Sequence, residues 1–261
     1  MKRVLTIAGS DSGGGAGIEA DIKTISALGA YACTTITAVT AQNTLGVAGV
    51  HVLPPAFVRL SIETVLADIG ADIVKLGMLA NAGIIDAVAD VLPAAIPLVL
   101  DPVMVATSGA VLLPDDAIAA LQTRLLPRAA LVTPNLPELA KLAGQGVETV
   151  PERLTAARAL LAQGAAAVLV KGGHDRSPFL VDYLVTPGGV EEIGFDRIDT
   201  SSTHGTGCTM ASAIATGIAQ GLGLSAATRR ARHYLQQAIA QAPGFGRGHG
   251  PLNHLVRNFE P

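Results

Sequence analysis

The chain has 261 residues, of which 49% are hydrophobic and 15% are charged, and its formal net charge at pH 7 is −3. This composition excludes a disordered chain, and the slightly acidic balance argues against nucleic acid or an anionic membrane surface as the main partner. The two cysteines, Cys33 and Cys208, exclude a disulfide framework, and a reducing, cytoplasmic environment is the default expectation.

Short apolar runs rich in β-branched residues recur along the chain and predict strands that are buried on both faces. They cover residues 4–8, 33–40, 73–76, 98–100, 130–133 and 166–170. Segments with helical patterning lie between and after these runs, at residues 17–27, 56–67, 82–91, 115–125, 151–163, 206–220 and 225–242. Strands that alternate with helices in this way predict a doubly wound α/β fold.

Two further strand-like runs, 179–185 and 190–195, flank Pro187-Gly188-Gly189 and predict a hairpin at one edge of the sheet. No linker or repeat interrupts the pattern, so residues 1–261 are expected to form a single domain. Two long stretches, 24–58 and 200–228, contain no charged residue but are rich in Gly, Thr, Ser and Gln. They lack the ~20 mostly large apolar residues that a membrane span requires, so we expect buried core segments instead.

Polar segments follow nearly every predicted strand at the point where the strand ends. The six segments are 9–11, 41–43, 77–78, 101–102, 134–135 and 171–173. Ligands of parallel sheets bind outside the carboxyl ends of the strands. We therefore expect these six segments to line one long crevice.

The first glycine-rich segment, residues 9–17, has the sequence GSDSGGGAG and leads into a predicted helix. Glycines let the backbone approach a ligand closely, and the start of a helix points free N–H groups at it. The segment lacks the Gly-Lys-Ser/Thr ending of a Walker A loop, and Ile18 breaks the Gly-x-Gly-x-x-Gly pattern. A ligand-contacting turn is the favoured interpretation, and a flexible strand–helix connection is the alternative.

A second glycine-rich turn, residues 203–208 with the sequence THGTGC, also opens a predicted helix. Its N–H groups and the helix dipole would form a binding site for an anion. Cys208 would lie in the first helical turn, where its thiolate is favoured, and it could then act as a general base or a nucleophile. The alternative is a small buried cysteine in a tight contact between helix and sheet.

Five polar side chains at the predicted crevice are further candidates. Lys171 closes a buried strand, where it could reach a polyphosphate or could be solvated. Asp101 offers hard oxygen ligands to Mg²⁺, and Gln42 offers an amide that could recognise a heterocycle or cap a loop. Asn135 and Glu138 have the spacing of a helix capping box; the functional alternative is a nucleotide ligand and a water-mediated holder of Mg²⁺.

The six histidines show no spacing typical of a metal site, so zinc is not expected. His174 and His204 lie on the predicted rim, where they could contact phosphate. Cys33 lies inside a predicted strand and is interpreted as structural.

Taken in this order, the segments resemble the hydroxymethylpyrimidine/phosphomethylpyrimidine kinases of thiamine biosynthesis, which belong to the ribokinase-like superfamily. The matching pieces are AGSDSGGGAGIEAD at 8–21, AVTAQNTLG at 38–46, KLGML at 75–79, LDPVM at 100–104, TPNLPE at 133–138, VKGGH at 170–174, THGTGCT at 203–209 and GHGPLNH at 248–254. The resemblance spans almost the whole chain. It implies a three-layer α/β/α ribokinase-like fold with a mostly parallel central sheet and an edge hairpin.

The resemblance also implies a reaction: phosphoryl transfer from ATP with Mg²⁺ to the 5-hydroxymethyl group of 4-amino-5-hydroxymethyl-2-methylpyrimidine, then a second transfer that gives the diphosphate. Cys208 would accept the proton of the substrate hydroxyl, and the turn of Gly205, Thr206 and Gly207 would hold the transferring phosphoryl group. The other implied contacts are Gly9, Asp21, Gln42, Met78 and Val103 for the pyrimidine, Asn135, Lys171, Thr203 and His204 for the nucleotide, and Asp101 and Glu138 near Mg²⁺.

Two alternatives stand beside the pyrimidine kinase. One is a pyridoxal or pyridoxine kinase on the same fold, and the other is a non-catalytic sensor of pyrimidine or nucleotide. A sugar kinase is disfavoured, because such enzymes usually carry Asp where this chain has Cys208. Glu19 departs from the Gln that is more usual in the family. The family also implies a homodimer, and residues 106–110 and 174–178 are candidate lids.

Overall fold

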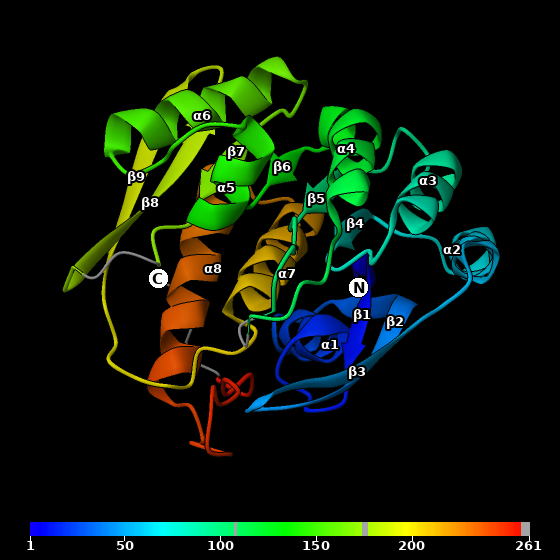
Figure 1. Ribbon diagram of the computed structural model, residues 1–261, viewed down its shortest axis with the longest axis horizontal. Helices are drawn as coiled ribbons and strands as arrows, with labels where there is room; N and C mark the ends of the chain where they lie inside the picture. The colour runs from blue at the N-terminus through cyan, green and yellow to red at the C-terminus, as the bar shows by residue number, and fades with distance from the viewer. Residues whose placement is uncertain (107–108, 174–176, 257–261) are drawn as a thin grey trace.

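The computed structural model of the protein describes residues 1–106, 109–173 and 177–256. Within these residues nine strands form one sheet in the order β3-β2-β1-β4-β5-β6-β7-β8-β9 (Figure 1). The strands are β1 Arg3–Asp11, β2 Tyr31–Asn43, β3 Gly46–Val52, β4 Ile73–Leu76, β5 Leu98–Leu100, β6 Leu131–Val132, β7 Val168–Val170, β8 Phe179–Thr186 and β9 Gly189–Asp196. The six central strands, β2, β1, β4, β5, β6 and β7, are parallel to one another, and β3, β8 and β9 join the sheet through antiparallel pairs.

Helices cover both faces of the sheet. They are α1 Gly17–Ala27, α2 Pro55–Asp68, α3 Ala82–Val91, α4 Asp115–Arg124, α5 Leu136–Ala143, α6 Val150–Ala162, α7 Thr206–Ala219 and α8 Leu224–Ala240, with a 3-10 turn at Leu126–Arg128. One hydrophobic core lies between the sheet and α2 to α6, and a second lies between the sheet and α1, α7 and α8. The predicted three-layer α/β/α fold is therefore confirmed.

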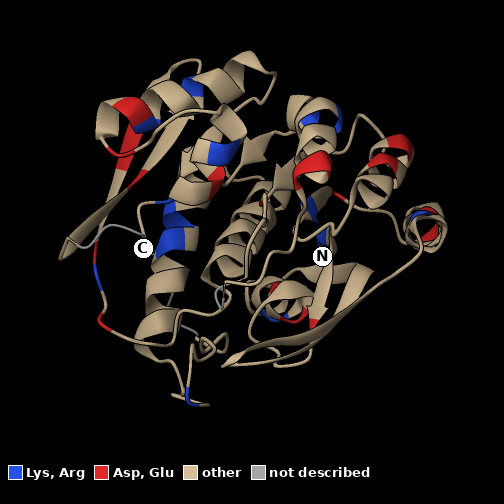
Figure 2. Cartoon of the chain, in the orientation of Figure 1, with Lys and Arg blue, Asp and Glu red and all other residues tan. Residues whose placement is uncertain are grey.

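The alternation of side chains along the central strands decides what each core contains. On β4, Ile73 belongs to the core beneath α1 and α7, whereas Val74 and Leu76 belong to the opposite core. Successive strand residues face opposite sides of a sheet. Lys75 therefore points to the same side of the sheet as Ile73, toward α1 and α7. It is one of the few charged residues on the central strands (Figure 2).

Most predicted elements agree with the structure to within about two residues, but the strand β3 was not predicted. Its seven residues include Gly46 and Gly49 and are half-buried or exposed throughout, so the buried apolar run that identified the other strands is missing. β1 also continues beyond the predicted end, because it pairs with β2 again after a bulge, through Ser10 with Val39 and Asp11 with Thr40. Both edges of the sheet therefore end in a hairpin, not only the predicted β8–β9 edge.

None of the helices in the described part of the chain is long and apolar enough to span a membrane.

Candidate active site

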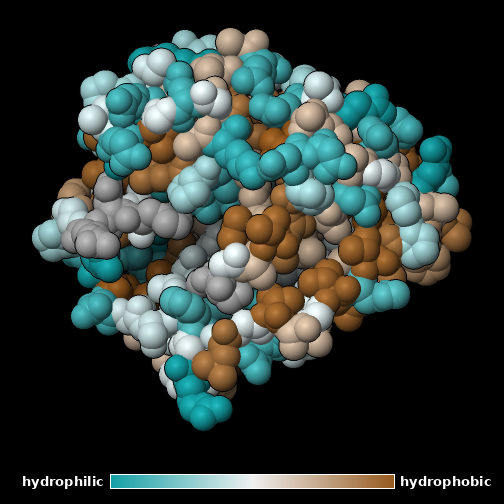
Figure 3. Space-filling model, viewed as in Figure 1, coloured by the Kyte–Doolittle hydropathy of each residue, from teal (hydrophilic) through white to brown (hydrophobic). Residues whose placement is uncertain are grey.

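A cavity of about 630 Å³ lies at the carboxyl ends of the parallel strands. Its mouth is the hollow in the surface seen in Figure 3. Each of the six predicted rim segments contributes lining residues, and the contributors include Gly9, Gln42, Met78, Asp101, Asn135 and Lys171. The predicted single crevice is thus present. The sequence placed these segments correctly because parallel strands deliver their carboxyl ends to one edge.

Asp11 organises the first glycine-rich loop from within. Its Oδ1 accepts from the Gly13 amide at 2.8 Å, and its Oδ2 accepts from the Gly15 and Ala16 amides at 3.0 and 2.9 Å. Burial raises the pKa of Asp11, but hydrogen bonds from His204 and these amides outweigh that effect, so its pKa lies below the usual value. The expectation that this loop offers free N–H groups to a ligand is wrong for these three amides.

Glu19 closes the same loop from the first turn of α1. Its carboxylate accepts from the Ser10 hydroxyl at 2.6 Å and from the Asp11 amide at 2.8 Å. Gly17 is required here, because a Cβ at this position would lie 2.3 Å from the Gly9 carbonyl oxygen. The loop is therefore a fixed wall of the cavity rather than a flexible connection.

The second glycine-rich turn packs against the first. Gly205 has φ +84°, and a Cβ there would lie 1.8 Å from the Gly15 carbonyl oxygen, so only glycine fits. No side chain caps the start of α7 at Gly205, and residues 205–208 line the cavity. The first amide groups of a helix have no partner within the helix. This turn, and not the Asp11 loop, offers amide groups to an anion.

Asp101 and Lys171 meet beneath that turn. The Lys171 ammonium and the Thr133 hydroxyl each donate to Asp101 Oδ1 at 2.9 Å, and a Cβ on Gly207 would lie 3.3 Å from Lys171 Nζ. Asp101 Oδ2 is buried and has no hydrogen-bond partner among the described residues. Burial raises the pKa of Asp101, but the charges of Lys171 and Lys75 outweigh burial, so the pKa lies below its usual value. Asp101 is therefore a carboxylate, and its Oδ2 is the oxygen without a partner.

Asn135 and Glu138 form the predicted capping box at the start of α5. The Asn135 side chain accepts from the Glu138 amide at 2.9 Å, and the Glu138 carboxylate accepts from the Asn135 amide at 2.8 Å. Both residues also line the cavity, so the cap and the functional interpretation are compatible. Burial raises the pKa of Glu138 to about 7, although Lys171, 4.0 Å away, opposes the shift.

Asp21, predicted to contact the pyrimidine, does not line the cavity. It is fully buried, and its carboxylate accepts from Thr6 on β1, Ser212 on α7 and the Lys75 ammonium. The resemblance assigned Asp21 to the pyrimidine, but the sequence could not show which face of α1 this residue occupies. The buried Lys75, which no sequence motif marked as a partner, explains its position.

Cys208 lies in the first turn of α7 and lines the cavity. Burial raises the pKa of its thiol to about 11, although the charge of Lys75 and a hydrogen bond from the Gly17 amide lower it. The expectation that its helix position favours the thiolate is therefore wrong: desolvation outweighs the helix. At neutral pH the ligand-free protein carries a thiol here.

Gln42 and His204 face each other across the cavity wall, with Gln42 Nε2 and His204 Nε2 3.2 Å apart. His204 Nε2 also lies 2.8 Å from Asp11 Oδ2, and since that carboxylate can only accept, Nε2 carries the proton. Gln42 Oε1 accepts from the Thr40 hydroxyl at 3.2 Å, so the Gln42 side chain lies between Thr40 and His204. His204 is thereby committed to Asp11, whereas His174 lies outside the described residues.

Apolar side chains and the remaining predicted contacts complete this part of the cavity. Met78 and Val103 line it, and a Cβ on Gly9 would lie 2.9 Å from the Met78 sulfur. Thr203 and Thr206 line it as well. Of the two candidate lids, residues 107–108 and 174–176 lie outside the described part of the chain.

One end of the cavity was missed by the sequence analysis. It is lined by side chains of β9, the following loop and α8, among them Phe195, Ile198, Arg232, Leu235, Gln236 and Ile239. The Arg232 guanidinium lies 3.8 Å from the Phe195 ring centroid and pairs with the buried Asp182. These residues follow no local motif, because only the tertiary fold brings α8 to the crevice.

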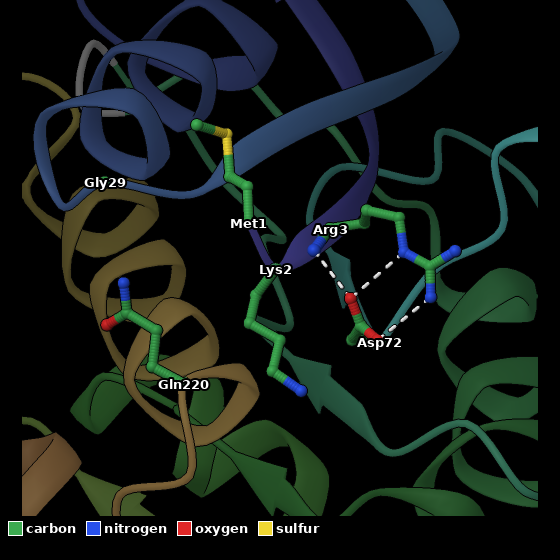
Figure 4. A pocket seen from close by; sticks show the side chains of 6 residues that line it. All are labelled: Met1, Lys2, Arg3, Gly29, Asp72 and Gln220. Atoms are coloured by element: carbon green, nitrogen blue, oxygen red, sulfur yellow. Dashed lines mark hydrogen bonds and ion pairs between the residues drawn. The ribbon is translucent and has the colours of Figure 1, made fainter.

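A second, open cavity of about 530 Å³ lies at the opposite, amino-terminal ends of the strands (Figure 4). Its lining includes Lys2, Gly29 and Gln220, and the Arg3 guanidinium turns aside to pair with Asp72 at 3.0 Å. None of the predicted site residues lies there, so the carboxyl-end cavity is the candidate active site.

The phosphomethylpyrimidine kinase family matches residues 11–253. The hydroxymethylpyrimidine/phosphomethylpyrimidine kinase of Escherichia coli is 46% identical over 265 residues, which cover 98% of each chain. The thiamine biosynthesis bifunctional protein ThiED of Geobacter sulfurreducens is 49% identical over 255 residues; these are 97% of this chain but 52% of that protein, so the chain spans about half of its length.

Among solved structures, the pyridoxal kinase from Staphylococcus aureus in complex with AMP-PCP and pyridoxal superposes with a TM-score of 0.91. The two sequences are 32% identical, and the match covers 99% of this chain and 95% of the kinase.

Proposed function

Because the chain belongs to the phosphomethylpyrimidine kinase family, we propose that it phosphorylates 4-amino-5-hydroxymethyl-2-methylpyrimidine twice for thiamine diphosphate biosynthesis. The first transfer from ATP gives the monophosphate, and the second gives the diphosphate. One observation carries the proposal: a single cavity joins the uncapped start of α7 with Cys208, the Asp101–Lys171 pair, and the wall of Gln42 and Met78. These are the parts that a phosphoryl transfer to a small heterocycle requires.

ATP as the phosphoryl donor is supported by the AMP-PCP bound to the similar pyridoxal kinase. Lys171, whose ammonium pairs with Asp101, would pair with the phosphates, and Asn135, Thr203 and His204 would line the nucleotide side. The unshared Asp101 Oδ2 fits a Mg²⁺ ion that arrives with the nucleotide, because Mg²⁺ usually keeps several waters and takes few protein oxygens. Within the described residues no cluster of three or more potential metal ligands exists, so the protein alone offers no cage.

Asp101 would hold the ion, with Glu138 reaching it through water. When bound, Mg²⁺ would neutralise charge on the phosphates. Both oxygen-bearing side chains flank Lys171, so the three together would fix where the phosphates lie. The amides of Gly205, Gly207 and Cys208 would hold the phosphoryl group during transfer, whereas the Thr206 amide donates to the Thr203 carbonyl oxygen at 3.4 Å.

In the first transfer the substrate hydroxyl oxygen bonds to the γ-phosphorus, the bond to the β–γ bridging oxygen breaks, and ADP leaves. The hydroxyl proton passes to Cys208 Sγ, which must be a thiolate at that moment. The second acceptor is a phosphate that is already ionised and needs no base. A neutral Cys208 thiol also avoids repelling that phosphate, so the raised pKa of Cys208 suits the second step better than the first.

The proposed acceptor is a pyrimidine rather than pyridoxal, because the pyrimidine kinase of Escherichia coli is 46% identical to this chain and the pyridoxal kinase from Staphylococcus aureus is 32% identical. Release of ADP from MgATP should be measured in parallel with hydroxymethylpyrimidine, its monophosphate, pyridoxal and ribose. Turnover with both pyrimidines supports the proposal. Turnover with pyridoxal alone, or pyrimidine binding with no turnover, overturns it in favour of a pyridoxal kinase or a sensor.

We further propose a homodimer in a reducing, cytoplasmic compartment. Both β3 and α2 expose large apolar side chains, Val50 and Val52 on β3 and Phe57 and Leu60 on α2, and association would bury such side chains. A reducing compartment would keep the Cys208 thiol available as a base. Light scattering after size-exclusion chromatography tests the assembly, and a monomeric mass at all concentrations contradicts it.

A further inference from the structure

The C-terminal segment after α8 packs beside the turns that border the active site, and its last part, residues 253 and 254, is firmly held. The Asn253 amide donates to the Ala238 carbonyl oxygen at 3.1 Å, and the Tyr234 hydroxyl donates to the His254 carbonyl oxygen at 2.9 Å. The imidazole of His254 is buried and lies 3.0 Å from the Thr209 hydroxyl. These contacts anchor the segment on α7 and α8.

The earlier part of this segment, residues 246–249, contacts the turn between β2 and β3. The His249 amide donates to the Thr44 carbonyl oxygen at 2.9 Å, and the Gly248 amide donates to Thr44 Oγ1 at 3.3 Å. There is no room for side chains: a Cβ on Gly246 would lie 2.2 Å from Thr44 Oγ1, and one on Gly248 would lie 2.0 Å from the Thr44 carbonyl oxygen. The Gly-x-Gly-x-Gly sequence at 246–250 thus permits a close backbone contact.

Between its two ends the segment holds the turn that carries His204. The His204 amide donates to the Gly250 carbonyl oxygen at 3.1 Å, and His204 forms an isolated parallel bridge with Pro251. The Thr203 hydroxyl lies 3.4 Å from His249 Nδ1. Residues 246–251, called the strap from here on, therefore contact the β2–β3 turn and the start of the α7 turn at once.

The two elements that the strap joins carry the side chains that face each other in the cavity. Gln42 lies two residues before Thr44, and its amide group meets the imidazole of His204. On the other side, Ser12 Oγ accepts from the backbone N–H of Gln42 at 2.8 Å and donates to the backbone carbonyl oxygen of Gln42 at 3.0 Å. The end of the hairpin is thus clamped between the Asp11 loop and the strap.

We propose that the strap is a positioning element of the acceptor site: it fixes Gln42 and His204 relative to each other so that the pyrimidine meets a preformed wall. This inference rests on the proposed function for the identity of the acceptor. A geometric displacement of about 1 Å can cost on the order of 100-fold in rate, so loosening the strap should weaken use of the acceptor strongly. Of the residues proposed for the nucleotide, the strap contacts Thr203 and His204 but neither Asp101 nor Lys171, so ATP binding should weaken much less than acceptor binding.

The test compares Gly248→Ala with Gly49→Ala. The first inserts a methyl group against the Thr44 carbonyl, whereas the second adds one in the same hairpin where no atom lies within 4 Å. For Gly248→Ala we expect the KM and the Kd of hydroxymethylpyrimidine to rise about 10- to 100-fold, and the Kd of ATP to rise by no more than about threefold, because Asp101 and Lys171 do not touch the strap. Gly49→Ala should leave all three constants unchanged. Equal weakening of ATP and pyrimidine, or the same loss in Gly49→Ala, overturns the proposal.

Hydrogen exchange gives a readout that does not depend on the acceptor. The amides of Gly248 and His249 should exchange faster in Gly248→Ala than in wild type and remain protected in Gly49→Ala. Faster exchange together with unchanged pyrimidine binding also overturns the proposal. If Gly248→Ala does not fold, Thr44→Val, which removes only the Oγ1 acceptor, takes its place. If the wild type binds pyridoxal and not the pyrimidine, the proposed function fails, and the same variants then test the strap with pyridoxal.

Discussion

Lys75 and Asp21 form an ion pair in which both side chains are fully buried and Lys75 Nζ lies 2.9 Å from each carboxylate oxygen. Thr6 and Ser212 donate to the same carboxylate, so each charge in this pocket of the core has partners. The pair joins β4, β1, α1 and α7 directly beneath the turn of Cys208. It therefore links the stability of the sheet to the electrostatics of the candidate base.

Replacing Lys75 with Met should lower the free energy of unfolding by about 3–5 kcal/mol, because it leaves the Asp21 charge buried and unpaired. Urea denaturation measures this difference. The matched control is Arg59→Met, which breaks an exposed pair with Glu63 and should cost at most about 1 kcal/mol. A loss from Lys75→Met no larger than that of the control would show that the pair does not hold the layers together.

Cys208→Ala should slow the first transfer about 10²- to 10⁴-fold and the second far less, because only the first acceptor gives up a proton to a base. Single-turnover rates with hydroxymethylpyrimidine and with its monophosphate measure the two effects separately. Cys33→Ala, a change to the other free cysteine, should leave both rates near wild type. Comparable losses in the two transfers would sink the assignment of Cys208 as the base.

The first transfer should also depend on pH through the Cys208 thiol, whose pKa burial raises to about 11. Below that value the thiolate fraction grows about tenfold per pH unit, so kcat/KM of the first transfer should rise with pH toward the limit of protein stability. Glu138 titrates with a pKa of about 7 but would serve both transfers. The ratio of the first rate to the second therefore isolates Cys208, and a pH-independent ratio would contradict its role.

Asp101→Asn should raise the Mg²⁺ concentration that gives half-maximal rate by about 10- to 100-fold, since it removes the negative charge of a carboxylate whose Oδ2 is buried without a hydrogen-bond partner. Titration of Mg²⁺ at fixed ATP measures the change. Asp86→Asn, on the exposed face of α3, serves as control for the loss of one negative charge. An unchanged Mg²⁺ requirement in Asp101→Asn would exclude Asp101 as a holder of the ion.

The sequence predicted the sheet, the helices and the crevice because these follow from local patterns and from the geometry of parallel strands. Helices 17–27 and 82–91 have the predicted bounds, and all six rim segments reach the cavity. Contacts between residues far apart in the sequence could not be predicted. Asp21 and Lys75 are 54 residues apart, so neither pattern revealed that they meet.

The protonation state of Cys208 could not be predicted either, because two opposing effects act on the pKa of its thiol. Its position in the first turn of α7 was read correctly from the glycine-rich turn. Whether the helix or desolvation controls the thiol pKa depends on how deeply the sulfur is buried, and no local pattern contains that depth. In the same way β3 escaped prediction because an exposed edge strand needs no apolar run.

The carboxylate of Asp11, which gathers the amides of Gly13, Gly15 and Ala16, has a consequence for mobility. These glycines, free to sample many conformations in an unfolded chain, are already immobilised before any small molecule enters. Backbone order parameters of residues 13–16 should therefore match those of β1, near the ~0.85 of rigid backbone on the picosecond-to-nanosecond timescale. An incoming acceptor then loses its own translational freedom but does not have to order this part of the protein.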